Sequence, residues 1–299
     1  MTCGTADCPI PGQVDLSVII VNYNTIDLLQ KCLTSIQSQV GTTHEIFVVD
    51  NASTDGSAIL VKKLFPTVIL LENATNLGFA KANNLALRQA KGRFVYFLNP
   101  DTEVSPGCFA AMLTYMKQHP HIGLAGTRII YPDGRPQSSV EYSYPGSRYA
   151  RRELQGLKGK IAWLLGASLI ARHEAIEGGN GFDEGYFLYG EDIDLCLVLR
   201  KKGWELGYIP EATIVHWEGQ SERKSLPLEV WKKKFAAEML FFAKHYSPAT
   251  IKAIRRANTL QALWRIVTIT LALPFHRNKQ QSREKLAKYR LALKVYGCG

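Results

Sequence analysis

One short stretch constrains this 299-residue chain more than any other: the sequence Phe-Val-Tyr-Phe-Leu-Asn-Pro-Asp at 94–101. Five consecutive apolar or aromatic residues are typical of a strand buried on both faces, as in a parallel sheet. Pro100 cannot donate to a ladder and fixes its own φ, so the strand must end before it. Asp101 is therefore expected just past the carboxyl end of a central strand, where open α/β sheets bind ligands. The plainer alternative is that Asp101 only caps a helix beginning near Val104.

The residues before this stretch alternate between strand and helix patterns. A buried strand is predicted over 16–22 and further strands over 44–50 and 68–71, and apolar residues at helical spacing separate them. Ser53 or Thr54 is expected to cap the second helix. This alternation predicts an α/β fold with a doubly wound, mostly parallel, Rossmann-like sheet. A dinucleotide site is excluded, because the first strand leads into Asn-Tyr-Asn-Thr and not into G-x-G-x-x-G.

The pattern changes after this alternation. A region rich in Gly, Pro, Ser and Arg over 132–160 indicates a long loop. The other elements predicted in this part of the chain are helices over 106–118 and 191–202 and strands over 161–172 and 204–209. The segments 122–131 and 212–217 are not assigned to a helix or a strand. Beyond residue 221 the pattern is helical and basic throughout.

Charge divides the chain in the same way. The formal net charge is +10, yet residues 221–299 hold 17 Lys/Arg and 4 Asp/Glu, which makes the remainder slightly acidic. We therefore predict a flexible N-terminus over 1–13, an α/β domain over 14–220 and a basic amphipathic helical extension over 221–299. The start of the chain has no signal-peptide pattern, and the apolar run 263–275 is too short to span a bilayer, so a cytoplasmic location is expected.

Polar residues follow the predicted strands where those strands end. They are Asn22, Asp50, Asn99 and Asp101, and the turn before the third helix adds Asn76 and Gly78. A single polar residue at a strand end is more often a helix cap. Because the strands are parallel, however, all of these groups are expected along one edge of the sheet. A nucleotide needs such a set: an amide and a carboxylate for base and ribose, and a metal ion for the diphosphate.

Two more features carry chemistry. Glu191, Asp192 and Asp194 open a predicted helix. The helix dipole favours acidic residues there, but a carboxylate at the mouth of a pocket can also act as a general base on an alcohol. His216 follows the last predicted strand and is more simply a structural residue. Paired with Asp101, it would complete an oxygen and nitrogen ligand set suited to Mn²⁺ or Mg²⁺.

Taken in order, these motifs resemble the family 2 glycosyltransferases of GT-A fold, most closely the bacterial rhamnosyltransferase branch. The resemblance covers residues 14–220. It rests on Val-Ile-Ile-Val-Asn-Tyr-Asn ending at Asn24, Val-Val-Asp-Asn-Ala-Ser-Thr-Asp-Gly ending at Gly56, Asn-Leu-Gly-Phe-Ala from Asn76, Leu-Asn-Pro-Asp ending at Asp101, Gly-Glu-Asp-Ile-Asp ending at Asp194, and His216.

The resemblance implies roles for individual residues. Asn22 and Asp50 would contact the nucleotide, with Asn76, Gly78 and Asn99 lining its site. Asp101 would bind the metal together with His216, although Asn99 stands where the family more often has a second aspartate. Asp192 matches the catalytic base, and Trp163, Gly166 and Glu191 are expected on the acceptor side.

The implied activity is inverting, metal-dependent transfer of one sugar from a nucleoside-diphosphate sugar to a saccharide or lipid-linked acceptor. A processive synthase is disfavoured, because Gln-Ala-Leu-Trp-Arg at 261–265 reverses the last two residues of that class's Gln-x-x-Arg-Trp motif. Two alternatives stay open: a nucleotidyltransferase that makes the activated sugar, and a non-catalytic sugar-nucleotide-binding module.

The basic extension suggests a partner of its own. Apolar and aromatic residues alternate with Lys and Arg over 226–275, a composition typical of helices that lie on anionic bilayers. We therefore expect a peripheral location on the inner face of the cell membrane, with a homo-oligomer left open. Nucleic acid is not expected, since the extension carries no recognisable nucleic-acid-binding motif.

Overall fold

The computed structural model describes residues 14–178, 181–217, 227–273 and 279–297. The N-terminus over 1–13 and the boundary predicted at 220–221 lie outside these ranges. Contacts divide the chain into two compact units. The first comprises residues 1–142, 158–187 and 192–221, and the second comprises 143–157, 188–191 and 222–299.

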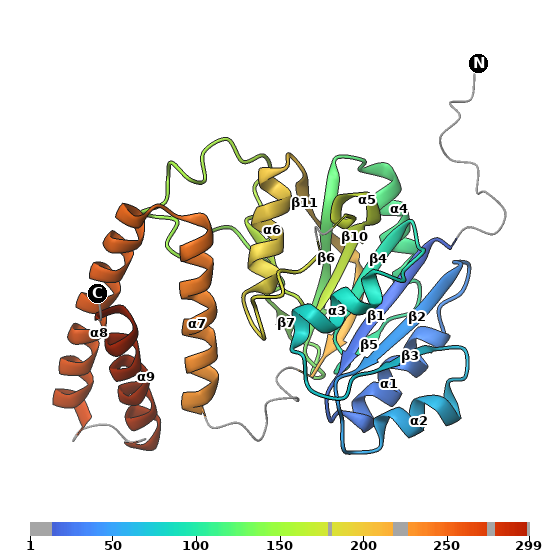
Figure 1. The fold of residues 1–299 in the computed structure, drawn as a ribbon, viewed down its shortest axis with the longest axis horizontal. Helices are drawn as coiled ribbons and strands as arrows, with labels where there is room; N and C mark the ends of the chain where they lie inside the picture. The colour runs from blue at the N-terminus through green and yellow to red at the C-terminus, as the bar shows by residue number, and fades with distance from the viewer. Residues whose placement is uncertain (1–13, 179–180, 218–226, 274–278, 298–299) are drawn as a thin grey trace. The chain divides into compact units, whose positions relative to one another are not determined.

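The first unit is built on a nine-stranded sheet of order β3-β2-β1-β4-β10-β6-β11-β5, with β7 paired to β6 (Figure 1). The strands are β1 Leu16–Asn22, β2 His44–Asp50, β3 Ile69–Glu72, β4 Phe94–Leu98, β5 Thr102–Val104, β6 Ile122–Ile130, β7 Pro136–Gln137, β10 Ser168–Arg172 and β11 Glu205–His216. Pairing is parallel from β3 through β4 and between β6 and β11, while β10, β5 and β7 run antiparallel to their neighbours. The predicted mostly parallel α/β sheet is confirmed.

Helices cover both faces of this sheet, which explains the continuous apolar runs of its central strands. In β1, Leu16, Val18 and Ile20 pack in one core and Ile19 and Val21 in the other. The first core also receives side chains from α1 Ile26–Gln37, α2 Ser57–Leu64 and α4 Cys108–Gln118. The second receives them from α3 Phe79–Leu87, α5 His173–Ile176 and α6 Glu191–Lys201.

Two suggested helix caps were wrong, one of them the plainer alternative for Asp101. Asp101 does not cap a helix, because β5 follows it and α4 begins only at Cys108 after Gly107. Neither Ser53 nor Thr54 caps α2, whose N-cap is Gly56 with a φ of 89°. The Ser53 hydroxyl instead accepts hydrogen bonds from Asn22 Nδ2 and the Asn24 amide, both at 3.0 Å.

The strand predicted over 161–172 is two strands in different sheets. β9 Trp163–Leu164 pairs with β8 Val140–Glu141, whereas β10 joins the main sheet. Between them the Gly166 amide donates to the side chain of Asp192, and the Ala167 carbonyl accepts from the Asn99 amide. The backbone at Gly166 and Ala167 therefore lies between the two strands, where it hydrogen-bonds to two residues of the predicted site.

Strand β11 contains most of the strand predicted over 204–209 and of the unassigned segment 212–217, with a marked irregularity between them. Ile209 pairs with Thr127 of β6, but the next pairing joins Thr213 to Arg128. Residues 210–212 thus bulge out of the ladder. Beyond the bulge β11 also pairs with β5, which places His216 opposite Thr102.

The second unit contains three helices within the described residues: α7 Pro227–His245, α8 Pro248–Ala272 and α9 Lys279–Gly297. This confirms the predicted helical extension. Ser247 caps α8, accepting a hydrogen bond from the Thr250 amide, and Pro248 occupies the first turn as capping rules favour. The segment 143–157 joins this unit, since Tyr246 donates to the Pro145 carbonyl at 2.7 Å and Thr250 donates to Glu153 at 2.7 Å. No helix among the described residues combines the length and apolarity needed to cross a membrane.

Candidate active site at the carboxyl ends of the strands

Asn22 and Asp50 meet as predicted at the ends of β1 and β2. They are paired across the parallel ladder, and Asn22 Nδ2 donates to Asp50 Oδ1 at 2.9 Å. Both side chains are buried. Asp50 Oδ2 also accepts from the Ser53 amide at 3.0 Å, and Asn22 Oδ1 accepts from the Thr25 hydroxyl at 2.7 Å. The amide and the carboxylate are therefore fixed at the sheet edge by the loops that follow the two strands.

Asn51 holds this edge together and was not predicted. Its Nδ2 donates to Asn76 Oδ1 at 2.9 Å and to the Gly78 carbonyl at 3.2 Å, while its Oδ1 accepts from Asn73 Nδ2 and the Leu77 amide. All four capacities of the buried amide are used within the turn before α3. Asn76 and Gly78 are thereby brought to the end of β2. In the sequence, the only signal is that Asn51 directly follows a strand-end aspartate.

Because Gly78 has no side chain, the backbone at Phe187 can pack closely against the start of α3. Its φ is +82°, and a Cβ placed on it would lie 2.5 Å from the Phe187 carbonyl oxygen. That same oxygen accepts a hydrogen bond from the Phe79 amide at 2.7 Å. Gly78 is thus required for close backbone approach as well as for its left-handed conformation.

Replacing Gly78 with alanine should therefore lower the free energy of unfolding by about 2–4 kcal/mol, since backbone strain and a steric clash add together. Gly134→Ala is the matched control, because Gly134 has a φ of +81° but nothing within 4 Å of the added Cβ. Thermal or urea unfolding of both variants measures the difference. Equal destabilisation of the two would show that the approach of Phe187 imposes no requirement.

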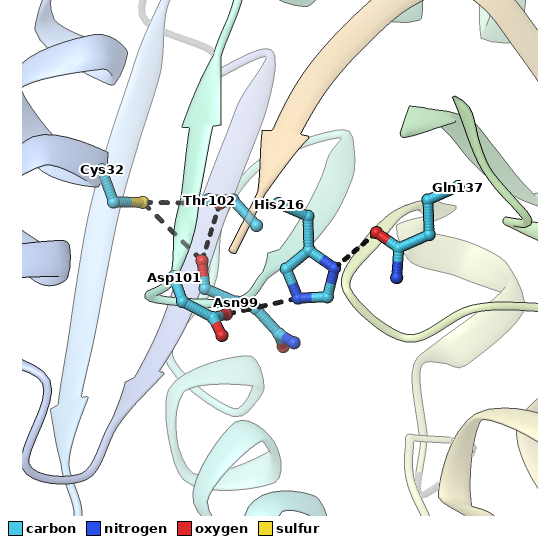
Figure 2. A network of polar contacts seen from close by, with 6 residues as sticks. All are labelled: Cys32, Asn99, Asp101, Thr102, Gln137 and His216. Atoms are coloured by element: carbon cyan, nitrogen blue, oxygen red, sulfur yellow. Dashed lines mark hydrogen bonds and ion pairs between the residues drawn. The ribbon is translucent and has the colours of Figure 1, made fainter. Parts of the chain in front are cut away.

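Asp101 and His216 come together from distant parts of the sequence. His216 Nε2 lies 3.4 Å from Asp101 Oδ1, and both side chains are about 6% exposed. Figure 2 shows the imidazole between Asp101 and Gln137, with one ring nitrogen turned toward each. The Trp217 amide donates to the Asp101 carbonyl at 2.9 Å and ties the end of β11 to this turn.

Gln137 is a second residue that was not predicted. Its Oε1 lies 3.0 Å from His216 Nδ1. An acceptor in that position favours the tautomer with the hydrogen on Nδ1, which leaves the lone pair of Nε2 facing Asp101. Nothing in the sequence marks Gln137, because it belongs to a two-residue strand in a region that reads as a loop.

The turn that contains Asp101 is stabilised by its own hydrogen bonds and by a contact with α1. The Thr102 hydroxyl donates to the Asn99 carbonyl at 2.7 Å, and the Cys32 thiol lies 3.8 Å from the same oxygen (Figure 2). Burial raises the pKa of Cys32 to about 12, so it remains a neutral thiol. Asn99 is half-buried, and its backbone is occupied on both sides by these contacts and by Ala167.

Asp192 lies at the start of α6. Its Oδ2 accepts from the Gly166 amide at 3.0 Å and its Oδ1 from the Ile193 amide at 2.8 Å. Loss of water around the carboxyl raises the pKa of Asp192 above its ordinary value, and these two hydrogen bonds oppose the rise. A carboxylate with a raised pKa held by fixed donors suits a general base.

The residues predicted on the acceptor side are placed unequally. Gly166 lies against Asp192, with a would-be Cβ 3.3 Å from the Asp192 Cβ. Trp163 is half-buried in β9, and Glu191 is the buried first residue of α6. Asp194 is buried and accepts a hydrogen bond from the Tyr186 hydroxyl at 3.2 Å, so this third carboxylate has a structural partner.

The side chains available as ligands decide whether a metal ion fits this site. No group of three or more His, Cys, Asp or Glu residues suited to a metal ion occurs in the part of the chain that the structure describes. Asp101 and His216 do provide one oxygen and one nitrogen at a separation that two ligands of a single ion can span. The pair therefore fits a divalent cation that takes its remaining ligands from a diphosphate or water.

A mostly parallel sheet with Asn22 and Asp50 at its strand ends, a buried Asp101–His216 pair and Asp192 at the start of α6 is the arrangement expected of a sugar-nucleotide-dependent transferase. Residues 17–177 match the family described as glycosyl transferase family 2. This match covers more than half of the chain, and the protein belongs to that family. It is a glycosyltransferase.

Relatives and solved structures agree with this assignment. The chain is 29% identical over 236 residues to the N-acetylglucosaminyl-diphospho-decaprenol L-rhamnosyltransferase of Mycobacterium tuberculosis, covering 69% of this chain and 77% of the relative. It is 28% identical over 231 residues to the rhamnosyltransferase WbbL of Escherichia coli, covering 69% and 84%. In fold it resembles the mannosyltransferase PcManGT from Pyrobaculum calidifontis in complex with GDP-Man and Mn²⁺, with a TM-score of 0.58, 19% identity and coverage of 95% and 87%.

Proposed function

We propose that this glycosyltransferase is inverting and metal-dependent, and that it transfers one rhamnose from a nucleoside-diphosphate sugar to a lipid-linked saccharide during the synthesis of a cell-surface polysaccharide. The observation that carries the proposal is the buried Asp101–His216 pair at the sheet edge. The sugar and the acceptor are suggested by the relatives, two of which are rhamnosyltransferases and one of which is named for a decaprenol-linked substrate.

In this proposal the nucleotide lies along the ends of β1 and β2. Asn22 and Asp50 contact the base and ribose, with Asn76, Gly78 and Asn99 lining the site. Asp101 and His216 hold Mn²⁺ or Mg²⁺, and the bound ion supplies stabilisation of the charge that develops on the leaving diphosphate. Gln137 keeps His216 in the tautomer that this role requires.

The chain's own chemistry is proton transfer. Asp192 accepts the proton of the acceptor hydroxyl as the hydroxyl oxygen bonds to the anomeric carbon, and the bond from that carbon to the diphosphate oxygen breaks on the opposite face. Trp163, Gly166 and Glu191 are assigned to the acceptor side. One displacement of this kind inverts the anomeric centre and needs no enzyme nucleophile.

A donor screen tests the proposal. Thymidine and uridine diphosphate sugars, rhamnose donors included, are offered with a short lipid-linked acceptor and with Mn²⁺, Mg²⁺ or a chelator. We expect metal-dependent release of nucleoside diphosphate from a rhamnose donor. Release of pyrophosphate from a nucleoside triphosphate and sugar phosphate would instead identify a nucleotidyltransferase, and tight binding without turnover would identify a binding module.

A further inference from the structure

Helix α8 carries a continuous exposed apolar face. Its five residues, named here the α8 stripe, are spaced by three and four positions and therefore share one side of the helix. Their exposed fractions are 67% for Leu260, 44% for Leu263, 67% for Trp264, 53% for Val267 and 71% for Leu271. Large apolar side chains gathered in this way mark an interaction surface rather than ordinary surface variation.

The core of the second unit does not require the α8 stripe. Ile254, Ala262 and Ile269 are buried on the opposite side of α8, and the helix contacts α9 and α7. On that side Arg255 donates to the Tyr296 carbonyl at 3.1 Å, and the Arg265 guanidinium lies 5.5 Å from the Tyr289 ring centre. The helix therefore has one face for its own unit and a second apolar face turned outward.

Basic residues predominate among the charged residues of α8 and α9. α8 contains no Asp or Glu, and α9 has Glu284 as its one acidic residue. Lys252 and Arg256 precede Leu260 by eight and four positions, so they extend the same side of α8, and both are exposed. An apolar face that contains Trp and is continued by cations has the composition of a helix lying in the headgroup region of an anionic bilayer.

We propose that the α8 stripe, with Lys252 and Arg256, is the surface by which this protein lies on an anionic membrane. This inference rests on the proposed function, because a lipid-linked acceptor is met at the bilayer. Charge complementarity selects this occupant over a second copy of the chain. Two copies meeting through α8 would bring no Asp or Glu to face Lys252 and Arg256, whereas phospholipid headgroups provide the negative charge that the helix lacks.

Vesicle flotation of the full chain tests the proposal. Wild type should float with phosphatidylglycerol–phosphatidylcholine vesicles at low salt, bind pure phosphatidylcholine weakly and detach as salt rises. The double variant Leu260→Gln/Trp264→Gln should partition about tenfold less or lower. Lys252→Gln/Arg256→Gln should lose only the preference for anionic lipid.

The matched control is Ile59→Gln/Leu64→Gln on α2, which removes two apolar side chains that are 72% and 47% exposed. It should float like wild type. Flotation of the α8 double variant at the wild-type level would overturn the proposal, as would equal binding to neutral and anionic vesicles. A dimer in sedimentation that the α8 substitutions dissociate, without any vesicle binding by wild type, would assign the stripe to a second copy.

Nucleoside diphosphate release separates this proposal from the proposed function. The α8 variants should retain release from the donor when a water-soluble acceptor is used, since no α8 residue belongs to the catalytic site. A wild-type protein that floats with anionic vesicles but transfers from no donor would defeat the proposed function alone. One that transfers sugar but ignores vesicles would defeat the membrane surface alone.

Discussion

Replacing Asp192 with asparagine should reduce turnover by a factor on the order of 10²–10⁴, the range for loss of a general base, while donor affinity changes little. Asparagine keeps the shape of the side chain but cannot accept the proton of the attacking hydroxyl. Turnover is measured as nucleoside diphosphate release at saturating donor and acceptor, and donor affinity is measured by calorimetry. Near-normal turnover would remove Asp192 from the mechanism.

Asp194→Asn is the matched control for this prediction. Asp194 lies on the same helix and is buried, but its carboxylate accepts from the Tyr186 hydroxyl. An asparagine oxygen can accept that hydrogen bond equally well, so the loss of turnover should stay below about tenfold. A larger loss in Asp194→Asn than in Asp192→Asn would reverse the assignment of the base.

The raised pKa of Asp192 also predicts the pH dependence. Because the base works only when deprotonated, kcat/KM should fall as pH decreases through that pKa, at a higher pH than for an exposed aspartate. This acid limb should be absent from Asp192→Asn. The linked effect on stability has the opposite sense: the unfolded chain ionises first as pH rises, so the group costs folding free energy once pH passes its unfolded pKa. Thermal unfolding across pH checks that sign.

Removing either proposed metal ligand should abolish most of the metal dependence of donor binding. With Asp101→Ala or His216→Ala, a calorimetric titration with nucleoside diphosphate should give nearly the same affinity with Mn²⁺ as with a chelator. Gln137→Leu leaves both ligands in place but removes the side-chain hydrogen-bond partner of His216 Nδ1. It should weaken metal-dependent binding by about 10- to 100-fold. The effect of Gln137→Leu should be the smaller one, because Gln137 contacts His216 but is not itself a proposed metal ligand.

His173→Ala provides the comparison for the histidine variant. Its Nδ1 lies 2.7 Å from the Gly92 carbonyl, away from the proposed metal ligands, so metal-dependent binding should be unchanged. If His216→Ala binds donor and Mn²⁺ like wild type, His216 is a structural residue that packs between Asp101 and Gln137.

The sheet could be predicted from sequence because its central strands are buried on both faces. Residues 16–22 and 94–98 are almost wholly apolar, and every residue in both strands is buried. The prediction of one strand over 161–172 was wrong where the backbone hydrogen-bonds to residues of the predicted site. Gly166 and Ala167 interrupt an apolar run whose composition is that of a strand, because their backbone groups pair with Asp192 and Asn99.

The site was predictable where a residue directly ends a strand, as Asn22 and Asp50 do. It was not predictable where a role depends on pairing between separated segments. Asn51 reaches Asn76 across 25 positions, and Gln137 reaches His216 across 79. The local sequence does not indicate which distant residue will be the partner, so these contacts are identified only in the folded structure.

The bulge at 210–212 implies that the number of residues is constrained even at Pro210 and Glu211, whose side chains are exposed. Side chains alternate across a strand, so a shift of one residue exchanges its two faces. A chain one residue shorter there, paired with β6 as before up to Ile209 and with the same number of residues bulged, would present Trp217 in place of His216 beside Asp101. Point substitutions at the exposed Pro210 and Glu211 should be tolerated during divergence, unlike at Ala212, which is buried in the first core, while single-residue insertions and deletions should be rejected.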